Sequence, residues 1–164
     1  MKKIFVGFAA VLALVPAISA FALSEEQEKV ISGECDTIHE TLKSLQKVDS
    51  KVRVYLGSYY EKILNKYMIP LNSRLVENSI SNTDLINNQA SFKGTKELFS
   101  NDFISYQKNL EELINSDCKT NPSGFYEKLE SVRSDRKKVR QDVLALESLI
   151  TKHKKAVNSL MEKL

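Results

Sequence analysis

Tryptophan is absent from this 164-residue chain, and glycine, proline and histidine are scarce, with five, three and two residues respectively. The scarcity of glycine and proline leaves long stretches without a helix breaker, and leucine, lysine and glutamate, which suit helices, are abundant. No glycine-rich phosphate loop, nucleophile elbow or His-Glu-x-x-His metal motif occurs. The composition therefore predicts an all-α protein and gives no positive sign of catalysis.

The N-terminal segment predicts export. Lys2 and Lys3 precede the uncharged residues 4–22, and a small-residue cleavage site of the Ala-x-Ala type ends at Ala22. No cysteine stands at this junction, which argues against lipid attachment. We predict a signal peptide over residues 1–22, with cleavage after Ala22, and a secreted or periplasmic domain over residues 23–164.

Retention of the same segment as a membrane anchor is the alternative, because about twenty uncharged residues could just span a bilayer. Pro16 and the Ala-x-Ala site favour cleavage. No later segment of the sequence is apolar enough to span a membrane, so we expect no membrane span after signal cleavage.

The charge balance is close to neutral once the signal peptide is removed. Because Lys2 and Lys3 fall in that segment, 22 of the 24 basic residues remain beside all 21 acidic residues. A dedicated binder of nucleic acid or anionic membrane would show a lopsided charge. The sequence therefore argues against both classes.

The only cysteines, Cys35 and Cys118, predict a disulfide, because an even pair in a small exported domain most often forms one. Free thiols and an intermolecular link are the alternatives. Metal binding is a more specific alternative, because Cys35 and His39 lie four residues apart and would share a helix face. No second His or Cys pair completes such a site, so we expect no metal and no cofactor.

Three stretches carry apolar residues in alternating steps of four and three, the pattern of a coiled-coil seam. They predict helices over about 24–69, 83–116 and 122–163. Ser24 is the predicted N-cap of the first, and Asn121 followed by Pro122 predicts the start of the third. Pro70 interrupts the first pattern, and the polar residues 78–82 predict a turn.

The seam positions identify the residues expected to face the core. In the first helix they are Ile31, Cys35, Ile38, Leu42, Leu45, Asp49, Val52, Leu56, Tyr59 and Ile63. In the second they are Leu85, Gln89, Phe92, Lys96, Phe99, Phe103, Tyr106, Leu110 and Leu113. In the third they are Phe125, Leu129, Val132, Arg136, Val139, Val143, Leu146, Ile150, His153, Val157, Leu160 and Leu164.

Short connections predict an elongated antiparallel three-helix bundle that runs up, down and up, with coiled-coil-like packing. If the disulfide sets the level of the helices, Cys35 lies level with the start of the third helix at Pro122. Asp49 then falls opposite Arg136, because Asp49 lies fourteen residues beyond Cys35 and Arg136 fourteen residues beyond Pro122. Both are charged exceptions in apolar seams. We interpret them as a buried salt bridge that fixes the register, the alternative being an acid-base or binding pair.

The same offset brings Lys66 beside His153, with Gln89 of the second helix nearby, and so predicts a second buried polar layer. His153 could sense pH there, because a neighbouring cation disfavours the charged imidazole. A partly exposed histidine at the end of the bundle is the simpler interpretation.

Two surface features are candidates for binding a partner. The first is a basic cluster on the third helix, and the second is a tyrosine-rich stretch in the first helix, from which some rings should reach the surface. The candidate residues are Arg133, Lys137, Lys138 and Arg140 in the cluster and Tyr55, Tyr59 and Tyr60 in the stretch. Charges paired within the chain, and a core widened around Gly57, are the respective structural alternatives.

These patterns favour a non-enzymatic exported protein that acts as a structural or protein-interaction module. A narrow three-helix core should leave no cavity of substrate size, and His39 and His153 fall on different helices at different levels. We expect the partner to be another protein, with self-association as a further alternative and a polyanion less favoured. A small periplasmic chaperone or assembly factor is the alternative function, and a metal carrier or enzyme the remote one.

Overall fold

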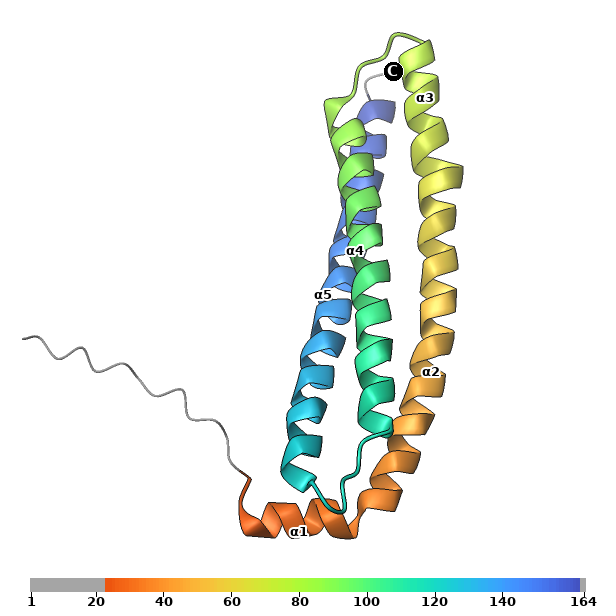
Figure 1. Cartoon of the computed structure of the whole chain (residues 1–164). Coiled ribbons are helices and arrows are strands. Elements are labelled where there is room, and N and C mark those ends of the chain that lie inside the picture. The colour runs from red at the N-terminus through yellow and green to blue at the C-terminus, as the bar shows by residue number, and fades with distance from the viewer. Residues whose placement is uncertain (1–22, 163–164) are drawn as a thin grey trace, which may run out of the picture.

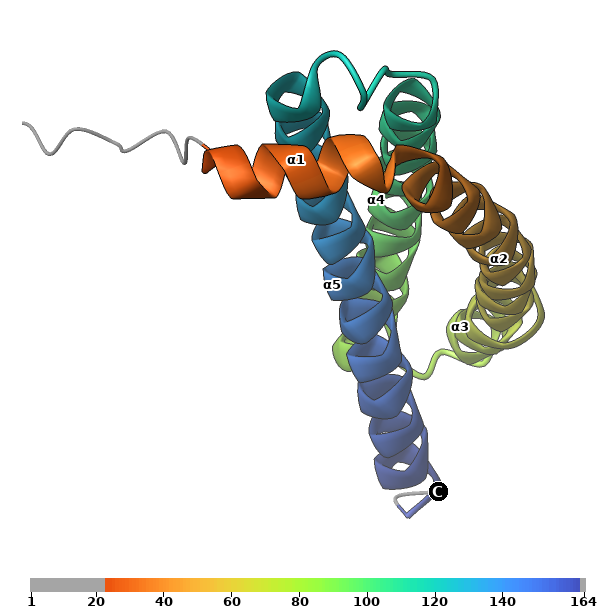
Figure 2. The same ribbon diagram turned by 90° about the horizontal axis from the view of Figure 1, so that it is seen from below.

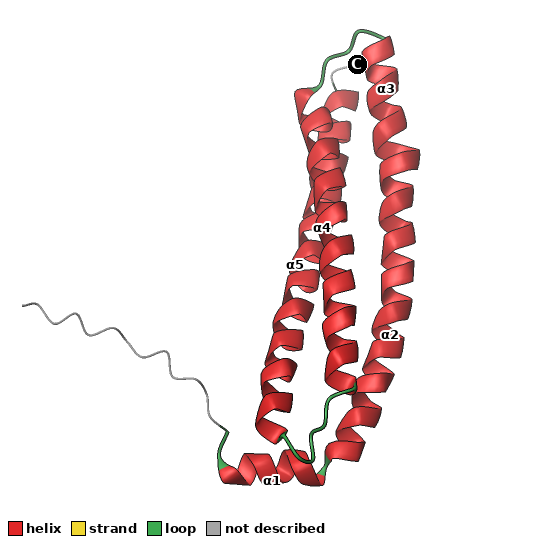
Figure 3. Ribbon diagram, viewed as in Figure 1, coloured by secondary structure: helices red, strands yellow, loops and turns green. Residues whose placement is uncertain are grey.

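The computed structural model describes residues 23–162 and shows an all-helical protein, with no strand among these residues (Figure 3). The predicted fold class is therefore confirmed at the level of all-α. The predicted signal peptide over residues 1–22 lies outside the described residues.

The first predicted helix is broken near its start. Helix α1 (Glu25–Gly33) begins at the predicted N-cap, where the Ser24 hydroxyl accepts from the backbone of Gln27 and the Gln27 side chain accepts from Ser24 in return. It ends at Gly33, and α2 (Cys35–Lys62) starts in a new direction, so α1 lies across the lower end of α5 (Figures 1 and 2). Gly33 favours this break because glycine weakens a helix by about 1 kcal/mol relative to alanine.

The first long helix also continues further than predicted. A π-helix, η1 (Ile63–Met68), joins α2 to α3 (Ile69–Glu77), which carries Pro70 in its first turn. Proline donates no backbone hydrogen bond and clashes with the carbonyl four residues earlier. The wider π turn precedes this position, and the helix continues beyond Pro70. The expected end of the first helix near residue 69 is therefore wrong.

Helices α4 (Thr83–Ile114) and α5 (Pro122–Met161) form a long antiparallel pair, and their bounds agree closely with the predicted ranges. Asn82 and Asn121 cap them, each accepting a hydrogen bond from the backbone three residues on. The chain therefore runs upward through α2, η1 and α3, downward through α4 and upward through α5 (Figure 1).

The core is built mainly on α4, whose buried side chains face both neighbouring segments. An aromatic series runs along it, with Phe99 and Phe103 at a ring-centroid distance of 6.1 Å and Phe103 and Tyr106 at 5.6 Å. In contrast, no Cα atom of α2, η1 or α3 lies within 8 Å of a Cα atom of α5. The side of the molecule between these segments is therefore open, and the cavities described below lie there.

Candidate functional site

A cavity of about 570 Å³ lies between α2 and α5, where the sequence predicted a closed seam. Its lining residues are Asp49, Val52 and Leu56 of α2, Phe99 and Phe103 of α4, and Arg133, Arg136, Lys137, Val139, Arg140 and Val143 of α5. We call it the Arg136 cavity. Its floor is apolar and aromatic, and its α5 edge is basic. Its volume is within the usual range for ligand sites, so the expectation that the core leaves no such space is wrong.

The predicted pair of Asp49 and Arg136 forms at one side of this cavity. Arg136 donates from Nε to Asp49 Oδ2 over 3.1 Å and from a terminal nitrogen to Oδ1 over 3.3 Å. The Asp49 side chain is 13% exposed but that of Arg136 is 54% exposed. The partners are those predicted, whereas full burial of the pair is wrong, because α2 and α5 are too far apart to cover the guanidinium.

The sequence did not identify a third member of this group, Tyr106 of α4. Its hydroxyl donates to Asp49 Oδ2 over 2.7 Å. Burial, reinforced by this hydrogen bond to a carboxylate, raises the pKa of Tyr106 above its ordinary value. Both Arg136 and Tyr106 hydrogen-bond to the Asp49 carboxylate. These three residues therefore link α2, α4 and α5, and Asp49 is not free to act as an acid or base.

Replacing Asp49 with alanine should therefore cost more stability than replacing Arg136. Asp49→Ala leaves the buried Tyr106 hydroxyl without its acceptor, a loss of about 1–3 kcal/mol. Arg136→Ala removes one half of an ion pair that water reaches, worth about 1 kcal/mol or less. Urea unfolding of both variants measures the difference, and equal losses would contradict this order.

The predicted basic cluster divides into paired and unpaired cations. Arg133 contacts Glu130, and Lys138 donates to Asp135 Oδ1 over 3.0 Å. Within residues 23–162, no carboxylate oxygen lies within 4.0 Å of Lys137 or Arg140. Charge pairing within the chain thus accounts for part of the cluster, and two exposed cations remain at the cavity edge.

The three predicted surface tyrosines do not form one patch. Tyr55 is 71% exposed and Tyr59 is 40% exposed, but Tyr60 is fully buried. The Tyr60 ring packs edge-on against Phe92 and Phe99, with centroids 6.1 and 5.6 Å away. Tyr60 is therefore a core residue, and its assignment to an interaction surface is wrong.

A second cavity, of about 650 Å³, lies higher on the same open side. Its lining residues are Tyr59 and Lys62 of α2, Ile63, Lys66, Tyr67 and Met68 of η1, Pro70, Leu71 and Arg74 of α3, and Ile150, His153, Lys154 and Val157 of α5. We call it the His153 cavity. It brings together Lys66 and His153 of the predicted second polar layer.

The third predicted member of that layer, Gln89, lies outside the His153 cavity. Gln89 accepts a hydrogen bond from Asn72 of α3 over 2.5 Å. Lys66 is exposed, whereas His153 is buried and its Nδ1 atom has no hydrogen-bond partner among the described residues. A single buried layer of all three residues is therefore wrong.

Stability should depend on pH through His153. Burial lowers the pKa of this imidazole below its ordinary value of 6.5. The unfolded chain therefore binds a proton at a higher pH than the folded protein does, so stability falls as the pH drops from about 6.5 through the folded pKa. Thermal melts between pH 7 and 5 should show this fall, and His153→Gln should flatten it. An unchanged slope in the variant would contradict this assignment.

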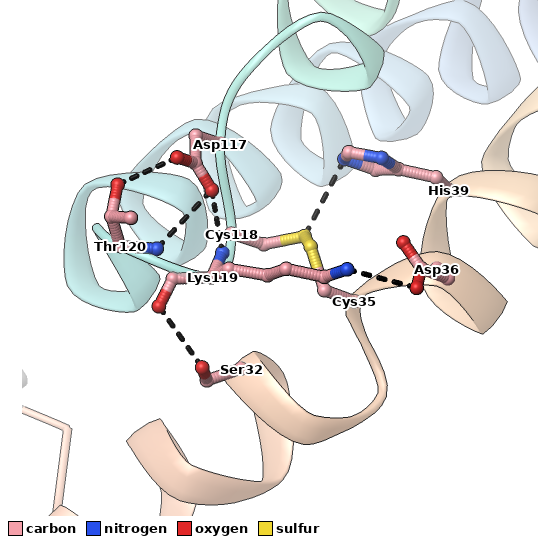
Figure 4. Close-up of polar contacts among 8 residues, drawn as sticks. All are labelled: Ser32, Cys35, Asp36, His39, Asp117, Cys118, Lys119 and Thr120. Carbon is pink, nitrogen blue, oxygen red and sulfur yellow. Dashed lines mark hydrogen bonds and ion pairs between the residues drawn. A yellow bond between two sulfur atoms is a disulfide. The ribbon is translucent and has the colours of Figure 1, made fainter.

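At the lower end, the disulfide joins the start of α2 to the connection between α4 and α5 (Figure 4). The Cα atoms of Cys35 and Cys118 are 5.6 Å apart. His39 Nε2 lies 3.4 Å from Cys118 Sγ and 3.1 Å from the Ser116 carbonyl oxygen. Lys119 crosses this junction, because its ammonium contacts Asp36 over 2.9 Å and its carbonyl accepts from Ser32 over 2.9 Å.

This junction is the one group of possible metal ligands that the described residues provide. The ligand atoms of Cys35, His39 and Cys118 lie within 4.8 Å of one another. The sequence placed Cys35 and His39 on one face, and the fold adds Cys118. Thiolates, rather than disulfide sulfurs, bind metals, and both sulfurs are used in the bond.

Comparison with protein-family models, curated proteins and solved structures finds no match to this chain. Among the described residues, no helix combines the length and the apolar character that a bilayer crossing requires. The two cavities and the charges around them are the features that indicate a function.

Proposed function

We propose that this protein is an exported, non-enzymatic protein-interaction module, built as an up-down-up three-helix bundle with α1 across its lower end. Its binding surface is the Arg136 cavity, and its partner is an acidic, partly apolar segment of another protein. The observation that carries this proposal is the combination of an apolar floor with the unpaired Lys137 and Arg140 at its edge.

The two parts of the cavity would contribute differently to binding. Apolar side chains of a partner gain free energy when they displace water from Phe99, Phe103 and Val143. The cations accelerate the approach of an acidic partner and reject basic ones. Asp49 does not cancel this selectivity, because Arg136 and Tyr106 already engage its carboxylate.

Affinity capture with matched charge variants tests this proposal. Lys137→Glu with Arg140→Glu reverses the basic edge, and we expect it to abolish capture of a partner from the envelope fraction of the producing cells. Lys93→Glu with Lys128→Glu makes the same change in net charge at exposed positions outside both cavities, and should capture as well as the parent. Equal capture by both pairs would refute the Arg136 cavity as the binding surface.

The alternative function, a small chaperone or assembly factor, is favoured by the open apolar side between α2 and α5. A chaperone would suppress aggregation of unrelated clients at stoichiometric ratios, whereas an interaction module would bind one or a few partners. Light scattering of aggregating model clients separates these two functions. The same instrument reports whether the protein self-associates.

Export is tested by the intact mass of the protein recovered from a bacterial host. A mass that begins at Leu23 and lies two hydrogens below that of the reduced chain is expected from signal cleavage and an intact Cys35–Cys118 bond. A mass that retains residues 1–22 would instead support a membrane anchor.

A further inference from the structure

The His153 cavity is not part of the proposed partner site, and its lining combines an apolar wall with a group of charged side chains. Its inner wall is apolar, with Met68 fully buried and Ile63, Leu71, Ile150 and Val157 around it. Its volume of about 650 Å³ is within the range of sites for small organic ligands. The interior therefore suits an apolar ligand body.

The charged residues that line this cavity are all of one sign. Among the described residues, four cations line it, Lys62, Lys66, Arg74 and Lys154, and no aspartate or glutamate does. Within residues 23–162, no carboxylate oxygen lies within 4.0 Å of any of these four side chains. Like charges on facing helices repel one another, so an anion between them would be stabilised.

His153 adds an imidazole to this lining. The side chain is more than nine-tenths buried, and its Nδ1 atom is enclosed and has no hydrogen-bond partner among residues 23–162. The charged groups that share its cavity are the lysines of α2 and η1, Arg74 of α3 and Lys154 of its own helix. Buried polar groups normally have partners, and an anionic ligand would supply the negative charge that this site lacks.

The length of the cavity accommodates one extended hydrocarbon chain. On the side of α2, η1 and α3 the lining extends from Tyr59 to Arg74, a helical length of about 22 Å. One acyl chain accounts for half of a bilayer core, which is about 15 Å. A single extended chain therefore fits along the cavity with its head group among the cations.

We propose that the His153 cavity binds a single-chain amphiphile with a carboxylate head, of the long-chain fatty-acid class. The chain lies along the apolar wall, and the carboxylate lies among Lys66, Arg74, Lys154 and His153. This site is separate from the Arg136 cavity, so it stands or falls independently of the proposed partner binding.

Calorimetric titration with laurate tests the proposal, with dodecyltrimethylammonium as a probe of equal chain length and opposite charge. We expect one laurate per protein and no binding of the cation. Octanoate should bind at least tenfold more weakly than laurate, because each buried methylene strengthens binding roughly fourfold. Equal binding of laurate and dodecyltrimethylammonium, or no binding of laurate, would overturn the proposal.

Charge-reversal variants test whether laurate binds in the His153 cavity. Lys66→Glu with Arg74→Glu should weaken laurate binding at least tenfold, whereas Lys93→Glu with Lys128→Glu should leave it unchanged. Laurate should also raise the pKa of His153 measured by nuclear magnetic resonance, since a nearby carboxylate stabilises imidazolium. An unchanged affinity for laurate in the variant with Lys66→Glu and Arg74→Glu would contradict binding in the His153 cavity.

The same titration separates this inference from the proposed function. Lys137→Glu with Arg140→Glu should lose its protein partner and still bind laurate with the parental affinity. Loss of laurate binding in that variant would place the amphiphile in the Arg136 cavity and overturn the present assignment.

Discussion

Removing the Cys35–Cys118 disulfide is expected to lower the free energy of unfolding by about 4–5 kcal/mol. The bond closes a loop across 83 residues of sequence separation, so its loss gives the unfolded chain much more freedom. Small domains are stable by only about 5–15 kcal/mol, and this bond would supply a large part of that total. Urea unfolding of the oxidised parent and of Cys35→Ala with Cys118→Ala measures the effect.

Alanine is the appropriate replacement because both cysteines are almost completely buried, so neither position should receive a polar group. Adding a dithiol reductant to the parent should give a similar loss, and adding it to the double variant should change nothing. A loss below about 1 kcal/mol in both experiments would show that the bond constrains the unfolded chain far less than its loop length implies.

Truncating Tyr60 is expected to have the next largest effect, a loss of about 3–5 kcal/mol for Tyr60→Ala. The ring is fully buried and packs against Phe92 and Phe99 where α2 meets α4. Tyr55→Ala, five residues earlier, removes a ring that is 71% exposed and should change stability by no more than about 0.5 kcal/mol. Thermal and urea unfolding of the two variants provides the comparison.

Tyr60→Phe separates the ring from its hydroxyl. The Tyr60 hydroxyl is buried without a hydrogen-bond partner among the described residues, and burial raises its pKa to about 12. Removing an unsatisfied polar atom while keeping the ring should leave stability unchanged or raise it slightly. A clear loss of stability in Tyr60→Phe would show that the hydroxyl has a partner in solution.

The long helices and some of their contacts could be predicted because they depend on local patterns. Alternating steps of three and four residues, together with Asn121 and Pro122, located α4 and α5 closely. The contact of Asp49 with Arg136 followed from counting along two helices from the disulfide. The break at Gly33 could not be predicted, because the apolar pattern continues across it from Ile31 to Cys35.

Tyr60 was misassigned because burial along α2 does not follow the heptad seam throughout. A heptad seam from Cys35 passes through Leu42, Leu56 and Ile63. The buried residues of α2 are instead Cys35, Leu42 and Tyr60, and the last two are separated by eighteen residues, or five turns of an ideal α-helix. Over this distance the heptad seam drifts away from α4.

The same drift explains why the cavities were not predicted. Seam residues such as Val52 and Tyr59 face the open side instead of a closed core, and they line the two cavities with their counterparts on α5. A periodic pattern tells which residues share a helix face. It does not tell how far apart two helices will lie, and that distance creates both candidate sites.

Photo-crosslinking from inside the Arg136 cavity tests the central proposal most directly. A photoreactive residue in place of Val143, which lines this cavity, should join the protein in its producing cells to one partner or a few. The same residue in place of Leu144, which is 54% exposed and outside both cavities, should not. Adding Lys137→Glu and Arg140→Glu should abolish the adduct. Equal adducts from both positions, or none from Val143, would contradict binding at this site.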